Sequence, residues 1–81
     1  MHYYLILEKS YTYDDGREEN TNVDNFLLET TEELKSDNPD WKNVVYSHDE
    51  QENWTWEYEF TKISSIAFEE MKKYLKTRKE L

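Results

Sequence analysis

Few residues of this sequence have the types and spacing that catalysis or metal binding requires. The two histidines are His2, at the start of the chain, and His48, which is followed by Asp49 and Glu50. A His-Asp-Glu run contains possible metal ligands, but adjacent loop residues rarely converge on one ion, and no second cluster completes a coordination shell. We therefore expect a solvated loop at residues 48–52 and no metal site.

Nucleophilic and acid-base catalysis have no better support. Ser64 and Ser65 have no histidine near them in the sequence, and a role in capping a helix explains them better. Glu57 and Glu59 would need one buried and one solvated environment to act as an acid-base pair, but both fall on one polar strand face. One glycine is too few for a phosphate-binding loop, and there is no cysteine nucleophile. The sequence predicts neither an enzyme nor a bound cofactor.

The N-terminal half of the chain predicts a hairpin. Residues 2–13 alternate with a period of two and are rich in aromatic residues, which is typical of a strand. The only glycine lies in the Asp-Gly pair of the turn at residues 14–17, and a polar strand returns through residues 18–23.

Residues 24–38 leave two alternatives open. In the preferred one, residues 26–28 finish the second strand and a short helix or turn follows near residues 30–37, with Thr30 and Glu33 as a capping box. In the other, Asp24 caps one longer helix. In both, Pro39 ends the helix, because the residue before a proline is pushed out of helical geometry.

The C-terminal half predicts a second antiparallel pair, at residues 41–47 and 53–63, and then a helix. Along the later strand an aromatic row alternates with a polar, acidic row: Trp54, Trp56, Tyr58 and Phe60 against Thr55, Glu57, Glu59 and Thr61. From Ser64 or Ser65 to the end of the chain, helical spacing predicts a stripe that covers the aromatic row, formed by Ala67, Met71, Tyr74 and Arg78. The expected fold is one α+β domain over residues 1–81, a small antiparallel β-sheet of about four strands packed on one face by a long C-terminal α-helix.

Charge is the most informative feature for function. The chain has 19 acidic and 10 basic residues, a net charge of −9, which argues against nucleic acid as a direct ligand. Residues 1–61 carry a net −12 and residues 62–81 a net +3. The acidic residues gather at the two predicted hairpin tips and on the exposed strand face. The predicted partner-binding residues are Asp14, Asp15, Glu18, Glu19, Asp49, Glu50, Glu52, Glu57 and Glu59.

Rows of fixed carboxylates repel one another, and a basic partner would relieve that repulsion. The predicted partner is a nuclease or another nucleic-acid-binding protein, which a small acidic protein would inhibit by imitating the charge of DNA. In size, acidity, lack of cysteine and α+β pattern the chain resembles, as a class, the small acidic inhibitors of phages and mobile elements, such as anti-CRISPR proteins and uracil-DNA glycosylase inhibitors.

Three alternatives remain open at this point. A toxin-immunity protein has the same profile. A non-catalytic interaction or regulatory module, as a monomer or a homodimer, is a further possibility, and an acidic surface can also serve only to keep a small protein in solution. The first apolar run, residues 3–7, is broken by Glu8 and no longer run exists, so we expect no membrane segment or signal peptide and a cytoplasmic location.

Overall fold

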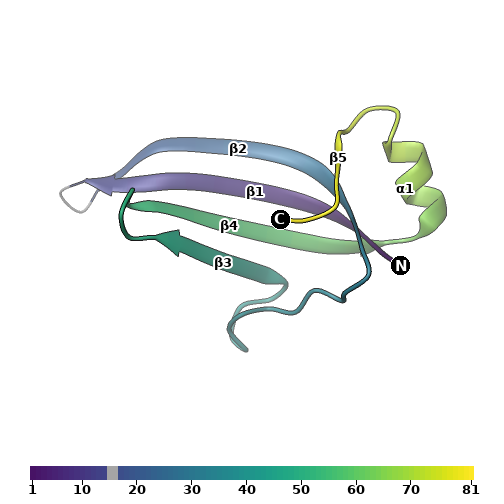
Figure 1. Cartoon of the computed structure of the whole chain (residues 1–81), viewed down its shortest axis with the longest axis horizontal. Coiled ribbons are helices and arrows are strands. Elements are labelled where there is room, and N and C mark those ends of the chain that lie inside the picture. Colours follow the sequence, from purple (N-terminus) through teal and green to yellow (C-terminus); the bar gives the residue numbers. More distant parts are fainter. Residues whose placement is uncertain (15–16) are drawn as a thin grey trace.

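The fold is a single twisted β-sheet with one short helix (Figure 1). The computed structural model describes residues 1–14 and 17–81, and the side chains of residues 1–12 and 21–81. The described elements are β1 (His2–Asp14), β2 (Arg17–Thr30), β3 (Val44–Asp49), β4 (Trp54–Ile63), α1 (Ser65–Met71) and β5 (Thr77–Arg78). The strands lie in the order β3-β4-β1-β2-β5, and only the β2–β5 pair is parallel.

The predicted N-terminal hairpin is confirmed. β1 and β2 pair from His2 with Thr30 to Asp14 with Arg17, and a bulge interrupts the register between Ser10 and Thr12. Residues 26–28 continue β2, so the alternative of one long helix from residue 24 is wrong. Residues 26–28 form a strand and not a helix because this conformation buries them. It places the apolar residues of β2 beside those of β1, which is central in the sheet and pairs with β4 on its other side.

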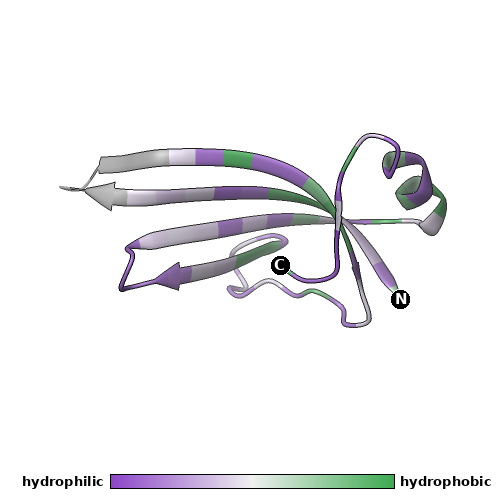
Figure 2. Ribbon diagram, turned by 45° about the horizontal axis from the view of Figure 1, so that its top comes forward, coloured by the Kyte–Doolittle hydropathy of each residue, from purple (hydrophilic) through white to green (hydrophobic). Residues whose placement is uncertain are grey.

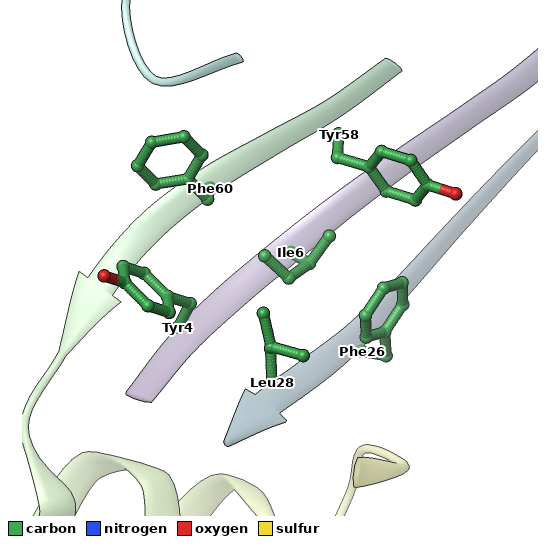
Figure 3. Close-up of a cluster of buried hydrophobic side chains, with 6 residues drawn as sticks. All are labelled: Tyr4, Ile6, Phe26, Leu28, Tyr58 and Phe60. Carbon is green, nitrogen blue, oxygen red and sulfur yellow. The ribbon is translucent and has the colours of Figure 1, made fainter. Parts of the chain in front are cut away.

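The largest cluster of the core lies on one side of the sheet, which we call the core face. Six buried side chains from β1, β2 and β4 form it (Figure 3): Tyr4, Ile6, Phe26, Leu28, Tyr58 and Phe60. Residues directly opposite one another on neighbouring strands share a face, so the register assigns the other side, the outer face, to residues such as Tyr3, Lys9 and Leu27. Leu34, Val45, Trp56 and Leu81 pack against the core cluster from its margins.

The predicted fold class is wrong, because no long C-terminal helix covers the sheet. Ser64 does cap a helix, and its Oγ accepts a hydrogen bond from the Ala67 amide at 3.1 Å. However, α1 ends at Met71, and Phe68 packs on the outer face with its ring centroid 4.6 Å from that of Tyr3. Tyr74, predicted to lie on the aromatic row, is exposed.

Beyond α1 the chain forms a strand, because an extended backbone can form hydrogen bonds with β2 and a helical backbone cannot. The amide of Leu27 donates to the carbonyl of Lys76 at 2.9 Å, and β5 pairs with β2 at Leu27 and Leu28. The basic residues expected in the last helical turns therefore lie in the turns after α1 and along β5. Leu81 then reaches the core face that the helix was expected to cover.

Of the short helix or turn expected near residues 30–37, this described segment forms a turn and no helix. Thr30 Oγ1 accepts a hydrogen bond from the Glu32 amide, which makes a turn instead of a capping box. The segment then runs along the edge of β3: the Asp37 amide donates to the Val44 carbonyl at 3.1 Å, and the Asp37 side chain accepts from the Tyr46 amide. A loop that satisfies these groups protects an edge strand from pairing with other chains.

Candidate functional site: the acidic end of the sheet

Sheet register brings the two acidic hairpin tips to the same end of the molecule. Thr12 pairs with Glu19 on one side and with Trp54 on the other, and Trp54 pairs with Asp49. With strands about 4.8 Å apart, the backbones of Glu19 and Asp49 are about 14 Å apart across four strands. Figure 1 shows the two tips at one end and α1 at the other.

We call this region the acidic end, and among the described residues it contains six of the nine predicted binding residues. Asp14, Glu18 and Glu19 occupy its β1–β2 hairpin, in the pairs Asp14 with Arg17, Tyr13 with Glu18 and Thr12 with Glu19. Asp15 was also predicted here and lies outside the described residues. The β3–β4 hairpin contributes Asp49, Glu50 and Glu52.

The β3–β4 tip uses one carboxylate to build its turn and presents two others. Asp49 Oδ1 accepts hydrogen bonds from the amides of Gln51 at 3.0 Å and Glu52 at 3.3 Å. Asn53 has a positive φ of 55°, a conformation that asparagine tolerates better than most residues. Glu50 and Glu52 are exposed, and no ion pair with a described residue neutralises either of them. Figure 2 shows this turn as uniformly hydrophilic.

The other two predicted residues, Glu57 and Glu59, lie apart from the tips, on the outer face of β4. Glu59 is exposed, whereas Glu57 is half-buried and its Oε1 accepts a hydrogen bond from the Tyr11 hydroxyl at 2.8 Å. Thr55 on the same face is buried. The expectation of a uniformly solvated face is therefore wrong, because the β1–β2 hairpin and β3 flank these side chains on both sides.

Aromatic residues near the acidic end were assigned to the core by the sequence pattern, and only part of that assignment is correct. Tyr58 and Phe60 are buried, but Trp54 and Trp56 are half-buried, with stacked rings whose centroids are 6.5 Å apart. Trp54 neighbours Asp49 and Thr12 on the core face. The alternation along β4 predicts correctly the face on which these tryptophans lie. How deeply each one is buried depends instead on the strand order and on residues distant in the sequence that pack beside them.

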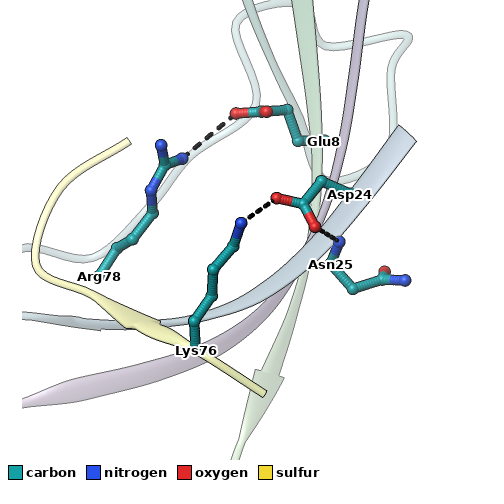
Figure 4. Close-up of polar contacts among 5 residues, drawn as sticks. All are labelled: Glu8, Asp24, Asn25, Lys76 and Arg78. Carbon is teal, nitrogen blue, oxygen red and sulfur yellow. Dashed lines mark hydrogen bonds and ion pairs between the residues drawn. The ribbon is translucent and has the colours of Figure 1, made fainter. Parts of the chain in front are cut away.

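The C-terminal segment neutralises carboxylates of the sheet at some distance from the tips (Figure 4). Lys76 Nζ forms an ion pair with Asp24 Oδ2, and this hydrogen bond lowers the pKa of Asp24 below its usual value. Arg78 Nη1 lies 3.3 Å from Glu8 Oε2, and the guanidinium stacks over Phe26 at 4.5 Å from the ring centroid. Burial raises the pKa of the neighbouring Tyr58, and the charge of Glu8 acts in the same direction.

The His-Asp-Glu run at the tip does not converge. His48 Nδ1 lies 2.8 Å from Thr55 Oγ1 on the outer face, while Asp49 lies on the core face because successive strand residues alternate. Among residues 1–14 and 17–81, no three His, Cys, Asp or Glu side chains are grouped so that they could hold a metal ion. None of the helices that the structure describes has the length and apolar character needed to cross a membrane.

Comparison with known proteins gives no relative from which a role could be transferred: no protein-family model, no curated protein and no solved structure matches the chain. The case for a function therefore depends on the surface itself.

Proposed function

We propose that this chain is a stoichiometric inhibitor that binds a basic, nucleic-acid-binding protein such as a nuclease through its acidic end. The observation that carries the proposal is the strand order, which places two acidic tips, distant in the sequence, about 14 Å apart at one end of the sheet. The major groove of duplex DNA, which rows of phosphates border, has a comparable width, about 12 Å. A basic cleft that grips a duplex would meet comparable charges here.

Charge asymmetry along the molecule supports the same proposal. Residues 62–81, with a net charge of +3, form the last residues of β4, α1 and the segment beyond it; α1 lies at the opposite end from the tips, and the C-terminus lies near the middle of the sheet. A molecule with separated charges is oriented by the field of a basic partner before contact, which raises the association rate. Trp54 and Trp56 lie beside the tips as half-buried aromatic groups, the side chains that most often anchor protein interfaces.

The proposed action is steric and needs no catalysis or cofactor, because a carboxylate-rich end seated in the partner's cleft excludes nucleic acid. We place it in the cytoplasm, in the setting of phage anti-defence proteins such as anti-CRISPR proteins. A toxin-immunity protein would use the same surface against a nuclease toxin, so partner identification separates these two settings.

A second candidate, a module that forms homodimers, is favoured by the short β5. This strand pairs with only two residues of the fourteen in β2, so much of that edge of β2 has no described strand beside it. Edge strands of this length are common sites of pairing between chains. Light scattering over a range of concentrations tests this candidate, and a constant monomer mass would remove it.

The test of the inhibitor proposal is affinity capture from a bacterial lysate, followed by binding measurements with the captured, purified protein. Binding should weaken as salt rises from about 50 to 500 mM and should be competed by duplex DNA. Glu50→Lys with Glu52→Lys should reduce affinity by roughly tenfold or more, because two attractions become repulsions.

The matched control is Glu69→Lys with Glu70→Lys, which changes the net charge equally on exposed residues of α1 at the opposite end. This control should bind nearly as tightly as the unaltered protein. Equal losses of affinity in the two double variants would assign the effect to net charge and not to the acidic end. The proposal would be refuted by an affinity that does not change with salt, with competing DNA or in the tip variant.

A further inference from the structure

A cleft on the outer face has a composition suited to a cationic ligand. It is lined by Trp41, Val44, Tyr46 and Glu57 and has a volume of about 350 Å³. The rings of Trp41 and Tyr46 have centroids 5.7 Å apart at an angle of 56°, and the two side chains are 41% and 40% exposed. Two aromatic rings therefore stay open to solvent beside a carboxylate.

Glu57 is held in a fixed orientation within this cleft. Tyr11, which is only 5% exposed, donates its hydroxyl to Glu57 Oε1 at 2.8 Å. A carboxylate has acceptor sites on both oxygens, so this bond orients the group and leaves further acceptor capacity. The register places Tyr46 on one side of Glu57 and Lys9 on the other, and the Lys9 ammonium lies 5.1 Å from the centroid of the Tyr11 ring.

We propose that this cleft binds an arginine side chain of a partner protein. A guanidinium can stack on the Trp41 or Tyr46 ring and donate in parallel to a carboxylate, which a rounder, more strongly hydrated ammonium does less well. An uncharged or anionic group in the same place would desolvate Glu57 without pairing it. Glu59, exposed on the same face and opposite Val44 of the cleft wall, adds to the negative potential.

Strand β3 connects the cleft to the acidic end, since it carries Tyr46 and leads into the β3–β4 tip. Tyr46 precedes Glu50 by four residues, or about 14 Å of extended chain, so one basic protein can contact both places. In this respect the inference rests on the proposed function, since a basic partner supplies the arginine. The chemistry of the cleft is nevertheless testable alone, with a small probe.

The experiment is an NMR titration of the ¹⁵N-labelled protein with N-acetyl-arginine-N-methylamide, and with the citrulline analogue as its uncharged isostere. The Trp41 indole N–H, assigned with Trp41→Phe, and the Tyr46 amide should shift and saturate at millimolar arginine compound. The citrulline analogue should shift them at least fivefold less. Shifts of equal size with citrulline, or shifts confined to the tryptophans of β4, would overturn the proposal.

Glu57→Gln is the decisive variant, because glutamine can still accept the hydrogen bond from Tyr11 and should keep the fold, which its amide spectrum will verify. It should weaken arginine binding about fivefold or more. Glu52→Gln makes the same charge change outside the cleft and should leave the titration unchanged; an equal loss in both variants would overturn the site.

The two proposals fail separately. If the tip variant Glu50→Lys with Glu52→Lys abolishes partner binding but the arginine compound never reaches Trp41, the cleft is refuted and the acidic end stands. If the arginine compound binds as described but the tip variant leaves partner binding unchanged, the acidic end is refuted as the binding site and the cleft stands.

Discussion

The two ends of the molecule are built by different means. At the end that carries α1, contacts between distant segments hold the chain: Phe68 is buried against Tyr3, and a backbone hydrogen bond from Leu27 to Lys76 joins β2 to the segment that enters β5. At the acidic end, the described β3–β4 tip is held by local hydrogen bonds around Asp49. The described β3–β4 tip therefore depends less on contacts with distant segments than the end that carries α1 does.

This difference means that charge at the acidic end can change without unfolding the protein. Carboxylates crowded on a hairpin tip repel one another, and they persist because the packing elsewhere stabilises the sheet. The same separation makes function and stability experimentally distinguishable. Substitutions at the α1 end should act on unfolding, and substitutions at the acidic end should act on binding.

The largest effect should come from Phe68→Ala, which removes a fully buried aromatic side chain between α1 and the sheet. We expect it to lower the free energy of unfolding by about 3 kcal/mol or more. Ile66→Ala is the control in the same helix, since Ile66 is 78% exposed and its loss should cost less than about 0.5 kcal/mol. Urea denaturation followed by tryptophan fluorescence measures both. Similar costs in the two variants would mean that α1 does not pack as described.

Arg78→Ala should have the next largest effect, because this side chain both stacks on Phe26 and pairs with Glu8. The Glu8 side chain is only 17% exposed, so it would lose its ion-pair partner in a poorly solvated place. We expect a cost of about 1 to 2 kcal/mol. Lys79→Ala, one residue further along and exposed, should be nearly neutral in the same urea denaturation assay. Equal losses of stability in the two variants would show that Arg78 acts only through its positive charge and not through its contacts with Phe26 and Glu8.

The residues of β5 also show where sequence reasoning reached its limit. The hairpin of β1 and β2 and the alternation of β4 could be predicted, because the Asp-Gly turn and the period-two pattern are local signals. The helical spacing that suggested a long helix to Arg78 was equally local, but the competing partners of this segment, Leu27, Phe26 and Glu8, are about fifty or more residues away in the sequence. Long-range pairing of this kind overrides local preference.

The candidate site was predictable to the same degree. The acidic residues of each tip are visible in the sequence, but their proximity depends on β4 lying beside β1, which no local pattern specifies. The cleft of Trp41, Tyr46 and Glu57 depends in addition on the path of residues 31–43 along β3. No local pattern in the sequence places Trp41 and Tyr46 beside Glu57.

The pH dependence of stability should report the contact between Lys76 and Asp24. Because the pKa of Asp24 is lowered in the folded protein, its contribution to stability is present above the unfolded pKa, about 3.9, and is lost as pH falls through the folded value. Lys76→Met should therefore be less stable than the unaltered protein near neutral pH, and the difference should vanish in acid. Thermal denaturation across this pH range measures it, and a difference independent of pH would contradict the assignment.

The smallest effect should come from neutralising the acidic end with Glu50→Gln and Glu52→Gln. These exposed carboxylates have no described ion-pair partner, so removing their charge relieves repulsion and should raise the free energy of unfolding by about 0.2 to 0.5 kcal/mol at low salt. The gain should disappear near 1 M salt, where screening acts over only about 3 Å. Glu69→Gln with Glu70→Gln should instead lose a little stability at low salt, because Lys72 and Lys73 pair with those residues. If the free energy of unfolding rises in the tip variant and falls in the α1 variant, although both change the charge equally, the carboxylates at the acidic end are retained at a cost to folding. A loss of stability in the tip variant would show that these carboxylates are structural, so no repulsion would be left for a basic partner to relieve.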